Sequence, residues 1–129
     1  MNNLQEKLLS VVIPAFNEQD MISTTFHTVK TILDNENIPF ELLFIDDGSN
    51  DLTYLRIAEL SKEHSEIKGI SFSRNFGKEA AIFAGLEAAG GSCCVIMDCD
   101  LQHPPATIVE MYRLWEDGYE VVEGVIYIF

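Results

Sequence analysis

Residues 8–18 read LLSVVIPAFNE, a continuous apolar run over Leu8–Ile13 that ends in the polar cluster Pro14–Glu18. A short run that is apolar throughout is typical of a strand covered on both faces, as in a parallel sheet. The same arrangement returns along the chain, because further apolar runs are also followed by polar residues. We expect further strands at Phe40–Ile45, Ile67–Phe72, Cys93–Met97 and Tyr119–Val125.

Segments with apolar residues at helical spacing separate these strands. We expect helices over residues 18–33, 51–63, 77–89 and 105–117. In the second of them, one helical stripe is expected to carry the apolar residues Leu52, Leu55, Ala58 and Leu60. Strands that alternate with helices predict βαβ units, and therefore an α/β protein with a mainly parallel sheet.

Composition limits the class of protein and its partners. A chain of 129 residues fits one domain, and 47% hydrophobic residues are enough for a core. The formal charge of -13 makes nucleic acid and anionic membranes poor partners, whereas it suits a protein that recruits divalent cations. We find no signal peptide and no run near the roughly 18 apolar residues of a membrane helix. With three cysteines in apolar settings, a reducing cytoplasm is the simplest location.

Polar clusters follow each of the first four expected strands. Because ligands of open α/β sheets bind at the carboxyl ends of the strands, these clusters are the candidate site. They are Pro14–Glu18, Asp46–Ser49, Ser73–Asn75 and Asp98–Gln102.

Asp98 and Asp100 are two residues apart, so in an extended segment both carboxylates point the same way. Together with the amide oxygen of Gln102 they form a set of hard oxygen ligands suited to Mg²⁺ or Mn²⁺. The alternative is an acid-rich turn without a metal, and His103 follows this cluster directly.

Two other clusters offer groups for a nucleotide. Of the adjacent acids, Asp47 is the better candidate to accept a hydrogen bond from a base or a ribose, and Asp46 is the structural one. Arg74 and Lys78 stand out among only 8 basic residues, and Arg74 can hold a phosphate beside the N-terminus of the helix that starts near Gly77. The alternatives are a turn that caps the next helix, for the acids, and ordinary surface cations, for Arg74 and Lys78.

Taken together, four motifs resemble the family 2 glycosyltransferases, and most closely the dolichol-phosphate and undecaprenyl-phosphate sugar transferases. The motifs are SVVIPAFNE (Ser10–Glu18), IDDGS (Ile45–Ser49), SFSRNFGKEAA (Ser71–Ala81) and MDCDLQHPP (Met97–Pro105). The resemblance covers about residues 8 to 124 and implies the GT-A fold, a Rossmann-like three-layer α/β/α arrangement. The chain 1–129 would be its nucleotide-sugar-binding part.

The resemblance also implies roles for individual residues. Pro14, Phe16 and Glu18 would line the nucleotide pocket and Asp47 would contact the base. Asp98, Asp100 and Gln102 would hold the metal and the diphosphate, with Arg74 and Lys78 near the donor. Asp98, Asp100 and Arg74 would carry the catalysis. The implied reaction moves a hexose from a UDP-sugar or GDP-mannose to a polyprenyl phosphate with inversion, at the cytoplasmic face of the membrane in the full-length form.

The sequence departs from the family pattern at its C-terminal end. Family members continue well beyond Phe129, and Val125–Phe129 does not have their usual polar and basic continuation. We therefore expect a truncated chain that lacks the acceptor half. One alternative is a non-catalytic remnant that at most binds nucleotide. Another is a receiver-like signalling domain, which length and acidity fit, although the acids do not follow the strands a receiver needs.

Overall fold

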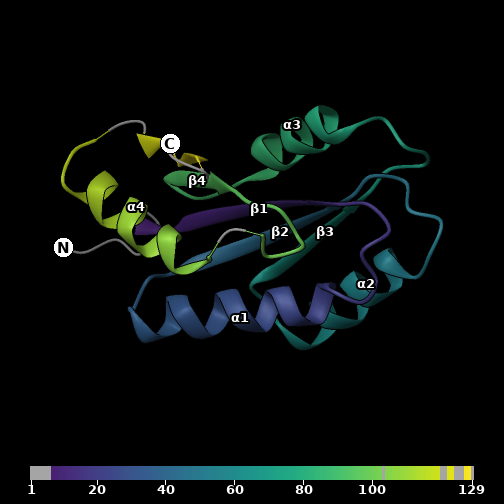
Figure 1. Cartoon of the computed structure of the whole chain (residues 1–129), viewed down its shortest axis with the longest axis horizontal. Helices are drawn as coiled ribbons and strands as arrows, with labels where there is room; N and C mark the ends of the chain where they lie inside the picture. The colour runs from purple at the N-terminus through teal and green to yellow at the C-terminus, as the bar shows by residue number, and fades with distance from the viewer. Residues whose placement is uncertain (1–6, 103, 120–121, 124–126, 129) are drawn as a thin grey trace.

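The computed structural model describes residues 7–102, 104–119, 122–123 and 127–128, and shows a twisted sheet between helices (Figure 1). The strand order is β3-β2-β1-β4-β6-β5, in which β1 to β4 are mutually parallel and β6 runs antiparallel to β4. The strands are β1 (Leu9–Ala15), β2 (Phe40–Asp46), β3 (Ile67–Ser71), β4 (Cys93–Ile96), β5 (Val122–Glu123) and β6 (Tyr127–Ile128). The prediction of a mainly parallel α/β sheet is confirmed. The order also differs from 2-1-3-4-5, the flavodoxin-like order that receivers share.

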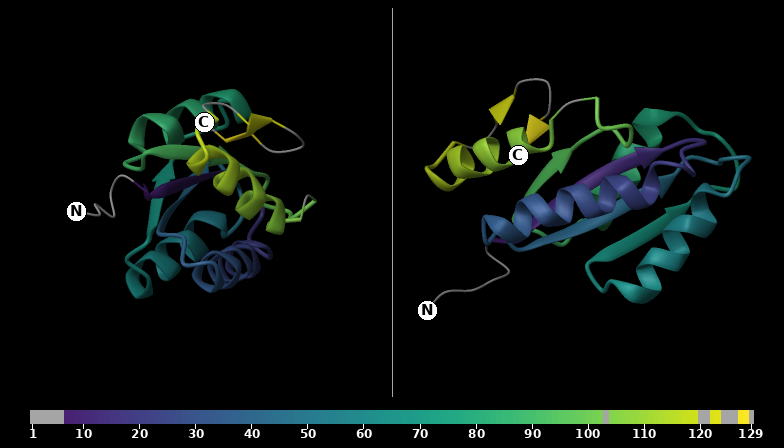
Figure 2. Two further views of the ribbon diagram at one scale, coloured as in Figure 1. Left: turned by 90° about the vertical axis from the view of Figure 1, so that its left-hand side faces the viewer. Right: turned by 60° about the horizontal axis from the view of Figure 1, so that its bottom comes forward.

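Helices cover both faces of the sheet and make three layers. The helices are α1 (Ile22–Asn35), α2 (Thr53–Glu63), α3 (Lys78–Ala88) and α4 (Ala106–Glu116). Buried side chains of α1, α2 and α4 share one core cluster with the sheet, whereas α3 belongs to a second cluster on the opposite face. The left view of Figure 2 shows α1 and α2 lying together below the sheet, with α3 above it. In the described part of the chain, no helix is long and apolar enough to cross a membrane.

The two core clusters follow from the period of two along a strand. Leu9, Val11 and Ile13 of β1 lie in the larger cluster, and Val12 between them lies in the smaller one. Both faces of β1 are therefore buried, as its continuous apolar run predicts.

Two expectations about the helices are wrong in detail. On α2 the buried residues are Thr53 and Ile57, whereas Leu52 and Leu55 are 46% and 50% exposed. The predicted stripe is out of phase at Leu52 and Leu55, whereas Leu60 lies partly buried against the larger core cluster. α1 begins at Ile22 instead of residue 18, because residues 19–21 form a separate turn in which Met21 N–H donates to the Glu18 carbonyl at 2.9 Å.

The expected fifth strand over Tyr119–Val125 is also different from the observed one. β5 spans only Val122–Glu123, and it pairs antiparallel with β6 instead of continuing the parallel sheet. β6, at Tyr127–Ile128, pairs in turn with Ile96 and Val95 of β4. Residues 120–121 and 124–126 lie outside the described part of the chain. Part of the apolar C-terminal segment thus has a partner strand in the sheet.

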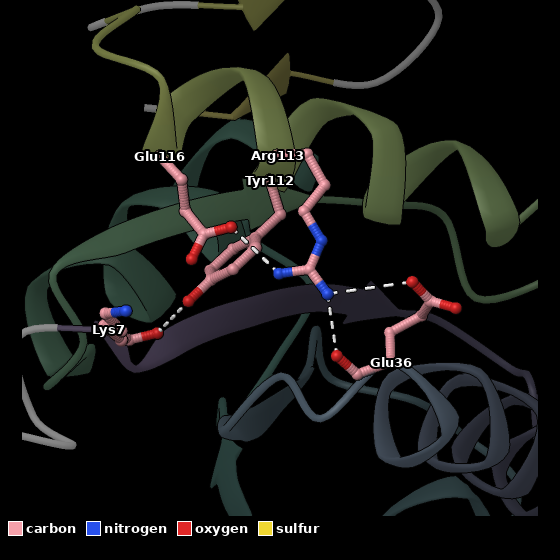
Figure 3. Close-up of polar contacts among 5 residues, drawn as sticks. All are labelled: Lys7, Glu36, Tyr112, Arg113 and Glu116. Atoms are coloured by element: carbon pink, nitrogen blue, oxygen red, sulfur yellow. Dashed lines mark hydrogen bonds and ion pairs between the residues drawn. The ribbon is translucent and has the colours of Figure 1, made fainter.

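α4 is tied to two distant parts of the chain (Figure 3). The Tyr112 hydroxyl donates to the Lys7 carbonyl at 2.6 Å, just before β1. Arg113 donates to the Glu36 carbonyl at 2.7 Å, at the end of α1, and also pairs with Glu116 at 2.8 Å. These contacts hold α4 beside the sheet and α1, and with it the segment that joins β4 to α4.

Replacing Gly85 by alanine is expected to destabilise the protein by about 1–3 kcal/mol, as overpacking does. A Cβ at this position would lie 2.4 Å from Val12 Cγ1 and 2.8 Å from Ile45 Cδ1, and a β-branched valine cannot easily move aside. Helix propensity alone predicts the opposite, a gain of up to about 1 kcal/mol. Urea unfolding of the two proteins decides between them, and a more stable Gly85→Ala variant would show that α3 does not pack closely on β1.

Candidate functional site

A pocket of about 180 Å³ opens at the carboxyl ends of β1 and β4, beside the first turn of α3. The chain leaves β1 toward β2 on one side and returns to β4 on the other, so this is the switch point of the sheet, where ligands bind in such folds. The pocket brings together most of the residues predicted from sequence. Its lining is Pro14, Ala15, Phe16, Glu18, Asp47, Lys78, Asp98, Cys99 and Asp100.

A second pocket of about 450 Å³ adjoins the first, and Phe16 lines both. Arg74 lines this second pocket, with its guanidinium 4.7 Å from the centre of the Phe76 ring. Gln102 is in neither lining, and its backbone N–H donates to Asp100 Oδ1 at 3.3 Å. Arg74 therefore lies beside the acidic pocket, Gln102 lies at its margin, and His103 is outside the described residues.

Asp98 and Asp100 line the first pocket, and among the described residues of that lining the only basic side chain is Lys78. Lys78 Nζ lies 2.6 Å from Asp98 Oδ1, and both side chains remain accessible to solvent. The Lys78 ammonium therefore lies at the first residue of α3, opposite the carboxylates that follow β4. A ligand with separated negative charges would contact both this ammonium and a cation held by the acids.

The donor set fits a hard divalent cation that a ligand helps to hold. Within the described ranges, no three His, Cys, Asp or Glu side chains gather as a metal-binding group. Mg²⁺ in proteins is commonly held by one or two carboxylates, with water and substrate phosphates as the other ligands. Asp98 and Asp100 supply that number of carboxylates, so the site matches a metal shared with a phosphate ligand better than an all-protein cage.

Asp47 organises the loop before α3. Its carboxylate, in a residue only 4% exposed, accepts from Phe76 N–H at 2.8 Å and from Gly77 N–H at 3.1 Å. The Asn75 side-chain amide donates to the same carboxylate at 3.1 Å. The sequence indicates Asp46 as the structural acid, and Asp46 indeed accepts from Ser49 N–H. The structure gives Asp47 a supporting role as well, since it fixes the backbone that leads to Lys78.

Hydrogen bonds join the loop after β1 to the loop after β2. Asn17 N–H donates to Ser49 Oγ, and Asn50 N–H donates back to Asn17 Oδ1. Asn17 has a φ of 53°, in the left-handed region that asparagine tolerates. Glu18 N–H donates to the fully buried Thr53 Oγ1 at 2.9 Å. The position of Phe16 and Glu18 on the pocket wall is therefore set by residues 49–53.

Sequence reasoning does not assign these supporting roles. In the sequence, Asn17 and Thr53 resemble ordinary loop and helix-start residues. Their contacts cannot be recognised there, because each bonds to a residue more than 30 positions away. The one local signal is Asn50–Asp51, a pair of residues of the kind that caps helices. Asp51 Oδ1 accepts from Thr53 N–H at 2.9 Å, although the N-cap residue of α2 is Leu52, which makes no side-chain capping bond.

The acids of the pocket repel one another in the absence of a cation. The pKa of Glu18 is raised, first by burial and then by the negative charges of Asp100, Asp51 and Asp98. An ionised Glu18 thus costs more free energy in the folded protein than in the unfolded chain. A divalent ion bound among these acids would reduce that repulsion.

Replacing Glu18 by glutamine is therefore expected to stabilise the protein at pH 7 without added metal. Between the ordinary carboxyl pKa and the raised pKa of Glu18 the unfolded state binds fewer protons, so wild-type stability falls as pH rises. The difference between variant and wild type should shrink below this window, where Glu18 is protonated in both states. Urea titrations at several pH values measure it. A variant that is less stable at pH 7 would show that Glu18 is not strained by its neighbours.

The family of the chain follows from comparison with known proteins. The model of "Glycosyl transferase family 2" matches residues 10–129. An uncharacterized glycosyltransferase of Bacillus subtilis, YkcC, is 44% identical over 120 residues, which are 90% of this chain and 36% of the relative. An undecaprenyl-phosphate 4-deoxy-4-formamido-L-arabinose transferase of Aeromonas hydrophila is 38% identical over 123 residues, 95% of this chain and 38% of that protein. This chain thus spans little more than a third of the length of these relatives.

The solved structures agree in fold. The mannosyltransferase PcManGT of Pyrobaculum calidifontis, solved in complex with GDP-Man and Mn²⁺, superposes with a TM-score of 0.66 over 95% of this chain and 44% of that one. At 16% identity this similarity shows the fold alone. The GT-A fold predicted from the four motifs is confirmed. With the family model matching nearly the whole sequence, we conclude that the chain belongs to glycosyltransferase family 2.

Proposed function

We propose that this chain supplies the donor site of an inverting glycosyltransferase that moves a hexose from a nucleoside-diphosphate sugar to a polyprenyl phosphate. The observation that carries the proposal is the first pocket, which Asp98, Asp100 and Lys78 line together at the switch point of the sheet, with Lys78 paired to Asp98. Two carboxylates that share a cation with a diphosphate, beside an ammonium, are the groups such a donor needs.

Different residues would contact different parts of the donor. Asp98 and Asp100 would hold Mg²⁺ or Mn²⁺, and a bound metal would stabilise the negative charge that develops on the leaving diphosphate. The ammonium of Lys78 stabilises the same charge from the opposite wall. Phe16, 42% exposed and shared by both pockets, offers an apolar face on which a base can stack. Arg74 in the adjoining pocket would contact the donor from its other side.

The acceptor and the nucleotide-sugar donor are inferred from the relatives. The Aeromonas relative is named for undecaprenyl phosphate, which supports a polyprenyl phosphate as acceptor. Because a phosphate acceptor is already an anion, the reaction needs little help from a general base. The PcManGT complex holds GDP-Man and Mn²⁺, which supports a nucleotide-sugar donor and a divalent ion. A GDP-hexose and a UDP-hexose both fit these observations. The transfer would take place at the cytoplasmic face of the membrane.

The transfer step is tested with labelled sugar donors. The chain is incubated with UDP-glucose or GDP-mannose carrying a radioactive sugar, with Mn²⁺ and with vesicles containing undecaprenyl phosphate. Label that moves to the lipid, and does not move when Asp98→Asn replaces the wild type, supports the proposal in full. Metal-dependent donor binding without transfer would support instead a chain that binds nucleotide and does not catalyse.

A further inference from the structure

Thr25, on the buried side of α1, contacts the acidic turn that follows β4. It is fully buried, and its hydroxyl donates to the backbone carbonyl of Cys99 at 2.5 Å. Cys99 stands between the two candidate metal-binding acids, and its own side chain is 3% exposed in the main core. A hydrogen bond at this carbonyl therefore fixes the midpoint of the segment that carries both carboxylates.

The hydroxyl of Thr25 has another partner available. In a helix a threonine hydroxyl commonly donates to the carbonyl four residues earlier, here Met21, whose oxygen already accepts the Thr25 backbone N–H at 2.8 Å. In this structure it donates across 74 positions to the turn after β4. A buried carbonyl that loses its donor is costly, so the two groups hold each other in place.

The backbone on either side of Cys99 shows why this contact matters. Met97 N–H donates to Val12 O at 3.0 Å, which ends the pairing of β4 with β1. Beyond it, Leu101 has a φ of 59°, a left-handed conformation that is unfavourable for a leucine. The turn therefore needs an external contact to keep this backbone, and Thr25 supplies one.

We propose that Thr25 is a positioning residue that preorganises Asp98 and Asp100 for the divalent cation. This inference rests on the proposed donor site. Because metal and diphosphate binding require ligand groups placed within about half an ångström, a small relaxation of the turn weakens binding strongly. Thr25 itself touches neither metal nor donor.

The test compares Thr25→Val, which removes the hydroxyl and keeps the shape, with Thr25→Ser, which keeps the hydroxyl. The matched control is Thr31→Val, the same change at an exposed position of the same helix. Binding of UDP and of GDP is titrated by calorimetry at increasing Mn²⁺, and amide hydrogen exchange is followed over residues 97–102. If the valine variant does not fold, Thr25→Ala replaces it.

We expect Thr25→Val to bind the nucleotide at least tenfold more weakly and to need more Mn²⁺, with faster exchange in the acidic turn. Thr25→Ser and Thr31→Val should bind within about threefold of wild type. If Thr25 only stabilised the fold, Thr25→Val would lower the urea midpoint of unfolding but leave the Mn²⁺ concentration needed for nucleotide binding unchanged. Equal affinity of Thr25→Val and wild type overturns this inference alone. A folded wild type that binds neither nucleotide overturns the proposed function, and this inference with it.

Discussion

Replacing Asp98 by asparagine is expected to lower the affinity for a nucleoside diphosphate with Mn²⁺ by about a hundredfold or more. Loss of a group that merely supports a metal ligand typically costs 10–100-fold, so loss of a ligand should reach the upper end of that range. The Asp98 carboxylate lines the pocket and forms an ion pair with the Lys78 ammonium. Calorimetric titration of both proteins at saturating Mn²⁺ measures the ratio.

The same substitution should leave the fold intact. The Lys78–Asp98 pair is solvent-accessible, and exposed ion pairs contribute only about 0–1 kcal/mol. Removing the charge of Asp98 also relieves part of the repulsion on Glu18. Asp117→Asn, at an exposed acid beyond α4, is the control and should bind like wild type. An Asp98→Asn variant that binds as tightly as wild type would remove Asp98 from the metal site.

Replacing Gly48 by alanine is expected to destabilise the protein by about 3 kcal/mol or more, since overpacking and a left-handed backbone both penalise it. Gly48 has a φ of 70°, and a Cβ there would lie 2.1 Å from the Arg74 carbonyl carbon and 2.3 Å from Asn75 N. Both are backbone atoms, which cannot rotate away as a side chain can. The loop that Asp47 holds would have to move, so nucleotide binding should fall as well. Urea unfolding and calorimetry measure the two effects.

Gly118→Ala is a control that separates the two penalties at Gly48, the close contacts of a Cβ atom and the positive φ angle. Gly118 has a φ of 109° but nothing within 4 Å of a Cβ, so alanine there meets only the conformational penalty, about 1–2 kcal/mol. We expect Gly48→Ala to be clearly the more destabilising of the two. Equal effects would mean that the loops after β2 and β3 do not touch at Gly48.

Much of the fold can be predicted because each local pattern agrees with the final structure. The continuous apolar runs around Val12 and Phe44 need cover on both faces, and helices supply it. The phase of α2 cannot be predicted in this way, since Leu52 and Leu55 are more apolar than Thr53, which is buried through its hydrogen bond to Glu18 N–H. Long-range polar contacts of this kind leave no periodic signal in the sequence.

The candidate site can likewise be predicted only in part from the sequence. The carboxyl-end rule and the Asp98–Asp100 spacing predict that the donor residues share one edge of the sheet, and most of them do line one pocket. The groups that hold them, Thr25 and Thr53, cannot be recognised from the sequence because a buried threonine in an apolar stripe resembles a core residue. The dual role of Asp47, which faces the pocket and also binds the backbone before α3, depends on how two loops meet.

The most direct test of the central claim is a calorimetric titration of the wild-type chain with UDP-glucose and GDP-mannose, in Mn²⁺ and then in a chelator. If Asp98, Asp100 and Lys78 form a donor site, one of these sugars should bind saturably with Mn²⁺ and lose most of its affinity in the chelator. A chain that circular dichroism shows to be folded and that binds neither sugar, or binds equally without metal, would contradict the account.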